Sequence, residues 1–111
     1  MKKSILEVAR VIRSKNSGPY ELTLDILFKD RKWYELFKTR NLVNEELICR
    51  LYKVQKEDIL GIIWFEPVSA VKITLRRPCP SGSPGDTDIY GAQQHAPLLG
   101  IEFDEEESHG F

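Results

Sequence analysis

The sequence has few of the residues that build metal centres and covalent cross-links. It contains only two cysteines, Cys49 and Cys79, which do not form a Cys-x-x-Cys pair, and only two histidines, His95 and His109. A structural zinc or an iron–sulfur cluster needs about four cysteine or histidine ligands, so no such cofactor is expected. Stability must come from a hydrophobic core, which a chain of 111 residues is long enough to form.

Long apolar runs are also missing. No stretch approaches the roughly 18 apolar residues of a membrane-spanning helix. Met1, Lys2 and Lys3 lead into a charged stretch and not into the apolar region of a secretory signal. We therefore expect a cytoplasmic protein that does not enter a membrane.

Charge of one sign is not concentrated in a binding stripe. The net charge is −1, and five of the 17 acidic residues lie in the segment 102–107, which leaves the rest of the chain modestly basic. Its lysines and arginines are scattered and not interleaved with aromatic residues, which argues against nucleic-acid binding. We expect one domain over residues 1–104 and an acidic, flexible tail over 105–111.

Apolar periodicity and capping residues indicate an α+β domain. Residues 20–28 alternate between apolar and polar and predict a half-buried strand. Asp30 and Asn44 are expected to cap two short helices, or the two parts of one helix broken near residues 39–43. The first of them carries an aromatic cluster typical of a core. Strands are also predicted over 5–13, 59–65, 68–77 and 98–103, and a third helix over 86–94, before Pro97.

Without the first strand, this order is β-α-β-β-α-β, the ferredoxin-like arrangement of an antiparallel sheet with helices on one face. The first predicted strand is then an extra N-terminal strand. In this arrangement the strand over 20–28 is central and already has two neighbours. The extra strand is therefore not expected to form a simple hairpin with it; either it lies elsewhere or an outer strand is displaced.

Two polar, flexible segments are candidate ligand sites. The first, residues 13–19, is predicted to be a loop in which Arg13, Ser14, Asn16 and Gly18 bind a ligand. In the second, residues 78–99, backbone N–H groups around the glycines can form an anion-binding concavity at a helix N-terminus. The ligand-binding candidates of the second segment are Ser81, Gly82, Ser83, Gly85, Asp88, Tyr90, Gln93 and Gln94.

Asp86 and His95 are the candidate catalytic residues. An imidazole titrates near neutrality and can act as a general base, although His95 can also simply close its helix. The charges of Asp86 and Asp88 repel an anion. In the alternative interpretation, the segment is a structural loop in which these two residues do no more than cap a helix. Asp86, Asp88 and His95 are suitable metal ligands by type, but the ligand periodicity of a calcium-binding loop is missing and no metal is predicted.

The two segments, Arg-Ser-Lys-Asn-Ser-Gly-Pro at 13–19 and Pro-Ser-Gly-Ser-Pro-Gly-Asp-Thr-Asp-Ile-Tyr-Gly-Ala-Gln-Gln-His at 80–95, carry a family resemblance. The chain resembles, over about residues 6–103, small bacterial and archaeal proteins of unknown function. These are similar to a free-standing form of the ferredoxin-fold domain that ends the acyclic terpene utilisation protein AtuA. The resemblance implies a companion of an AtuA-like large subunit in acyl-CoA or organic-acid catabolism.

Three functions remain open at this point. The chain can be a small subunit that adds residues to a site shared with an AtuA-like partner, with a carboxylate or CoA ester as ligand. It can be a non-catalytic ligand-binding or homo-oligomerisation module that pairs through a sheet edge. The third hypothesis is a stand-alone lyase or hydratase that uses His95 or Asp86.

Overall fold

The computed structural model describes residues 2–18, 21–76 and 96–104. It has an α+β architecture with antiparallel sheets, which is compatible with the predicted ferredoxin-like class. The strands are β1 (Lys2–Ser4), β2 (Ala9–Gly18), β3 (Glu21–Phe28), β4 (Ile59–Phe65), β5 (Ala70–Arg76) and β6 (Glu102–Asp104). The helices are α1 (Arg31–Thr39) and α2 (Glu45–Tyr52), with 3-10 turns η1 (Ile5–Glu7), η2 (Lys56–Asp58), η3 (Glu66–Val68) and η4 (Ala96–Gly100).

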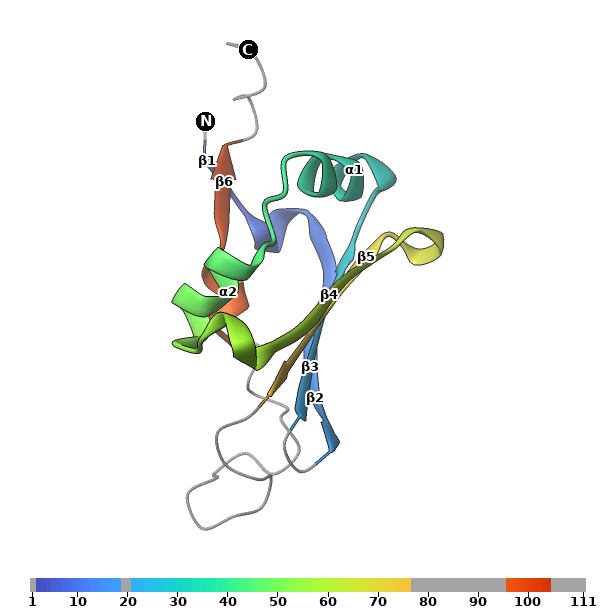
Figure 1. Ribbon diagram of the computed structural model, residues 1–111. Helices are drawn as coiled ribbons and strands as arrows, with labels where there is room; N and C mark the ends of the chain where they lie inside the picture. Colours follow the sequence, from blue (N-terminus) through green and yellow to red (C-terminus); the bar gives the residue numbers. More distant parts are fainter. Residues whose placement is uncertain (1, 19–20, 77–95, 105–111) are drawn as a thin grey trace.

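Four strands form one antiparallel sheet in the order β2-β3-β5-β4, and β1 pairs with β6 in a separate two-stranded sheet (Figure 1). The extra N-terminal strand, β2, does form a hairpin with β3, so the expectation that it could not was wrong. The alternative that an outer strand is displaced is confirmed, because β6 leaves the main sheet. The reason is the register: Gly18 pairs with Glu21, and so short a connection holds β2 beside β3.

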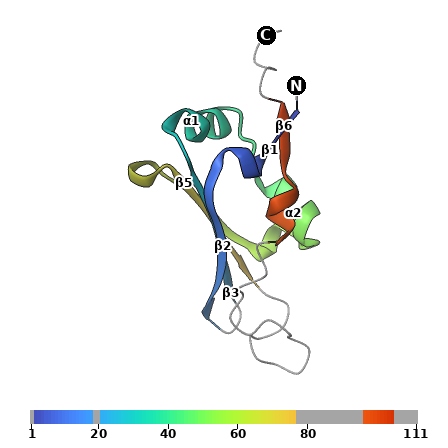
Figure 2. The same cartoon turned by 180° about the vertical axis from the view of Figure 1, so that it is seen from behind.

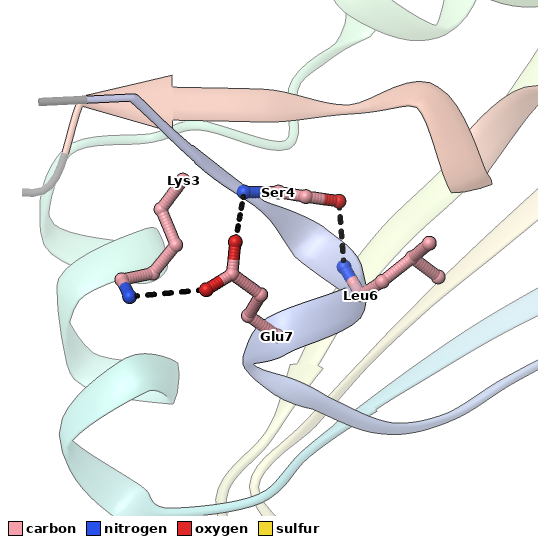
Figure 3. A network of polar contacts seen from close by, with 4 residues as sticks. All are labelled: Lys3, Ser4, Leu6 and Glu7. Atoms are coloured by element: carbon pink, nitrogen blue, oxygen red, sulfur yellow. Dashed lines mark hydrogen bonds and ion pairs between the residues drawn. The ribbon is translucent and has the colours of Figure 1, made fainter.

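The N-terminal strand begins later than predicted, because residues 5–7 form the turn η1. A capping box holds this turn (Figure 3): the Leu6 N–H donates to Ser4 Oγ at 3.1 Å, and the Ser4 N–H donates to the Glu7 carboxylate at 3.2 Å. The hydrogen bond from the Ser4 N–H and the nearby Lys3 ammonium hold the pKa of Glu7 below its usual value. Local polar contacts therefore replace strand pairing in this segment.

The two helices and the hairpin β4–β5 form where the sequence predicts them. Asn44 caps α2, since its Oδ1 accepts a hydrogen bond from the Leu47 N–H at 2.8 Å. Asp30 occupies the cap position of α1, but its side chain makes no described capping bond. The predicted strand over 98–103 is wrong in its first half, because residues up to Gly100 form η4. The predicted loop 78–85 and helix 86–94 lie outside the described residues.

Both helices and the β1–β6 pair lie on one side of the four-stranded sheet, as Figures 1 and 2 show from opposite directions. Tyr34 and Phe37 of α1 are fully buried there, which confirms the predicted aromatic core. The Phe37 ring lies 4.9 Å from that of Phe28 on β3 and 4.8 Å from that of Phe103 on β6, measured between centroids. Within the described ranges, no helix has the length and apolar character needed to cross a membrane.

Candidate functional site

The other face of the four-stranded sheet is open: none of the elements that the structure describes lies over it. Because successive side chains of a strand point to opposite faces, the buried Leu22, Leu24 and Ile26 of β3 face the core and their neighbours face outward. The open face carries Arg13 and Lys15 from β2, Thr23, Asp25 and Leu27 from β3, Ile63 and Phe65 from β4, and Ala70 and Lys72 from β5.

One half of the open face is a cationic hollow of about 560 Å³, lined by Arg13, Lys15, Thr23, Asp25 and Lys72. Asp25 stands directly opposite Arg13 on one side and Lys72 on the other. Arg13 Nε donates to Asp25 Oδ2 at 3.2 Å. Three cations therefore surround a single carboxylate, and the hollow has an excess of positive charge.

The other half is an apolar hollow of about 350 Å³, which also touches Arg13, Asp25 and Lys72. Its remaining lining is apolar: Leu27, Ile63, Phe65, Val68 and Ala70. Ile63 and Phe65 are 58% and 53% exposed, high values for large apolar side chains. The open face thus changes from apolar to cationic within one continuous surface.

This arrangement suits binding better than catalysis. The cationic hollow can hold a carboxylate or phosphate, and the apolar hollow can cover a hydrocarbon group next to it. Among the described residues that line the two hollows there is no histidine or cysteine, and Thr23 supplies their one hydroxyl. Among the described residues, no three His, Cys, Asp or Glu side chains gather as a metal site would require.

Of the ligand-binding side chains predicted in the first segment, the structure places only Arg13 on the open face, where Lys15 of the same segment lies beside it. The prediction of a loop is wrong for residues 13–18, which belong to β2. Ser14 and Asn16 stand opposite Leu24 and Leu22, whose side chains face the core, so they lie on the other side of the sheet from Arg13. Strand geometry therefore separates residues that a loop would have brought together.

Sequence reasoning missed Asp25 and Lys72 as site residues. The signal was present in the alternation itself, because both are charged residues at the polar positions of strands in which apolar and polar residues alternate. The residues around Asp25 and Lys72 do not by themselves indicate that β5 pairs with β3 and that Lys72 stands opposite Asp25. The candidates of the second segment, including Asp86 and His95, lie outside the described residues and stay predictions.

Comparison with known proteins adds one match. A family model described as "Domain of unknown function (DUF4387)" matches residues 5–102. No curated protein and no solved structure matches the chain.

Proposed function

The chain belongs to the DUF4387 family, and we propose that it is a small accessory subunit that binds a carboxylate or CoA ester on the open face of its sheet. The observation that carries the proposal is the meeting of an apolar and a cationic hollow on one face, which no described element covers. The resemblance to the AtuA-terminal domain suggests the setting: an AtuA-like large subunit as partner, in acyl-CoA or organic-acid catabolism.

The charges of the cationic hollow support an anionic ligand. The contact with Asp25 uses Nε of Arg13, so it orients the guanidinium on the open face. A guanidinium held in this way is suited to bind a carboxylate or phosphate through two parallel hydrogen bonds. Lys72 lines both hollows, so its ammonium is placed to attract the charged end of a ligand whose other end is apolar.

The apolar hollow supports a ligand that carries a hydrocarbon group. Each methylene that leaves water contributes about 0.8 kcal/mol to binding, so a short acyl chain gains several kcal/mol. Leu27 and Ala70 form the floor, and the exposed Ile63, Phe65 and Val68 are available to cover the chain. An acyl carboxylate or thioester matches both halves of the face, whereas a purely polar anion matches only one.

The subunit role follows from what the lining offers. Its charged groups bind and orient, but the described lining holds no acid–base pair or activated nucleophile of the kind that catalysis needs. A larger partner would supply the reacting groups.

The ligand part of the proposal is tested with octanoate and octanoyl-CoA by calorimetry. We expect binding by the wild type and an affinity about 10- to 100-fold lower in Lys72→Gln, since a charge-assisted hydrogen bond contributes about 1.5–3 kcal/mol. Arg50→Gln removes an exposed cation from α2, on the other side of the sheet, and should bind as the wild type does. Equal losses in the two variants, or no binding by the wild type at millimolar ligand, would contradict the site.

The partner part is tested separately by co-purification with the AtuA-like large protein. Association at micromolar concentration is the expected result. If the two proteins stay apart at that concentration, the accessory role is wrong even when the ligand binds.

A further inference from the structure

We propose that strand β4 is the interface of a homodimer, in which it pairs antiparallel with β4 of a second copy and Ile63 stands opposite Ile63. The pairing goes beyond the proposed function and does not depend on it: Ile63 and Phe65 line the apolar hollow and also lie at the seam, whereas the charged residues Arg13, Asp25 and Lys72 lie on the other three strands. Its basis is the contrast between the composition of β4 and its burial.

Strand β4 is the most apolar strand of the described chain, yet, like the polar edge strand β2, it has no buried side chain among its described residues. Its sequence is Ile-Leu-Gly-Ile-Ile-Trp-Phe, and not one of its seven residues is buried. Strands β3 and β5 each have four buried residues, although both contain charged side chains. Ile63 and Phe65 are exposed on the open face, and Ile62 and Trp64 are only partly buried on the core face. Both faces of β4 are therefore left with apolar surface to cover.

The position of β4 explains the incomplete burial. It is an edge strand, with β5 as its single strand neighbour in the described structure, so one row of backbone groups faces outward. Protein edges of this kind are normally protected by charged side chains or proline. The opposite edge, β2, has Arg10, Arg13 and Lys15, whereas β4 has no charge and no proline. An unprotected apolar edge is a template for pairing with another strand.

The register follows from the irregularity in β4. A shift between Ile59 and Gly61 interrupts the ladder, and residues 61–65 then pair with β5 one by one. The centre of this regular segment is Ile63. A two-fold axis through that position places Phe65 opposite Gly61 of the partner copy, and each such contact occurs twice.

The side chains of this register complement one another. A Cβ added at Gly61 would meet nothing within 4 Å, so the open face has room above the glycine. An aromatic ring that packs across an edge glycine fills such a space and stabilises the pairing. On the core face, Trp64 comes opposite Ile62 of the partner copy. The segment carries no charge, so two copies meet without repulsion, and this self-complementarity favours a second copy over an unrelated partner.

Sedimentation of the full chain tests the dimer. We expect a dimer at micromolar concentration and a dissociation constant at least ~10-fold higher in Ile63→Lys, because like charges directly opposite each other oppose strand pairing. Leu6→Lys is the matched control, since Leu6 is 56% exposed and Ile63 is 58% exposed, but Leu6 lies in η1. A monomeric wild type at 100 times that concentration, or equal weakening by the two variants, would overturn the proposal. Circular dichroism checks that both variants fold.

A cross-link tests the register independently of the affinity. In a background of Cys49→Ser and Cys79→Ser, we expect Ile63→Cys to form a disulfide-linked dimer on mild oxidation, since side chains directly opposite lie within reach of a disulfide. Val68→Cys, which is exposed in η3 beyond the end of β4, should stay unlinked. Cross-linking of Val68→Cys as fast as Ile63→Cys, or none by Ile63→Cys, would show that the register is wrong.

Discussion

Tyr34 carries both a favourable and an unfavourable contribution to stability. Its ring is fully buried and lies edge-on to Trp64 at 5.8 Å and to Phe28 at 6.4 Å between centroids. Such aromatic pairs stabilise by about 0.5–1.5 kcal/mol beyond the area that they bury. Its hydroxyl, however, has no hydrogen-bond partner among the described residues. A buried polar group without a partner costs about 1–3 kcal/mol.

At this position Tyr34→Phe should therefore raise the free energy of unfolding by about 1 kcal/mol, since it removes the unpaired hydroxyl and keeps the ring. Urea denaturation with an unchanged m-value measures the gain. Tyr52→Phe is the control, because Tyr52 is only partly buried and no gain is expected there. A loss of stability in Tyr34→Phe would mean that the hydroxyl does have a partner.

At the scale of the element, helix α2 ends in a conformation that its sequence does not favour. Lys53 follows the helix with φ 56° and ψ 45°, in the left-handed region, and its N–H donates to the Cys49 carbonyl. Glycine usually occupies this position, because a side chain there costs about 1–2 kcal/mol. The helix is held despite this cost by the Asn44 cap and by Ile48, which is fully buried.

We expect Lys53→Gly to stabilise the protein by about 0.5–1 kcal/mol, measured as a rise in the urea midpoint. Lys53→Ala loses the same charge but keeps the side-chain strain, so it should show no such gain. If both variants change stability equally, the effect comes from the charge and not from the backbone.

Across the whole molecule, the two ends of the described chain close the core together. The Ile5 N–H donates to the Ile101 carbonyl at 2.9 Å, next to the β1–β6 pair. An Arg40 terminal nitrogen donates to the Asp104 carbonyl at 2.6 Å, which ties β6 to the end of α1. The Phe103 ring lies between the rings of Phe37 and Trp33. The displaced strand is therefore part of the core and not an appendage.

Phe103→Ala should accordingly lower the free energy of unfolding by about 3–5 kcal/mol, the range for removing a buried phenylalanine. Glu102→Ala, on the exposed side of the same short strand, should change it by less than about 0.5 kcal/mol. Calorimetric melting of both variants makes the comparison. A small effect of Phe103→Ala would mean that β6 is dispensable for the fold.

Some features of the fold were predictable because their cause is local. The alternation in residues 20–28 predicts β3 and its buried face, and the caps at Asp30 and Asn44 predict where α1 and α2 begin. Residues 13–18 were predicted as a loop because Asn16, Gly18 and the following Pro19 are residue types that favour turns. Pairing with β3 overrides that preference, and this pairing depends on residues outside the segment itself.

For the candidate site, too, some features follow from the sequence and others do not. The sequence by itself determined that polar and apolar residues of each strand lie on opposite faces, because the period of two is fixed by strand geometry. It did not determine which face the helices cover, that β2 takes the edge beside β3, or that Lys72 stands opposite Asp25. Only the tertiary structure decided these, because strand order and register depend on contacts between segments that are far apart in the chain.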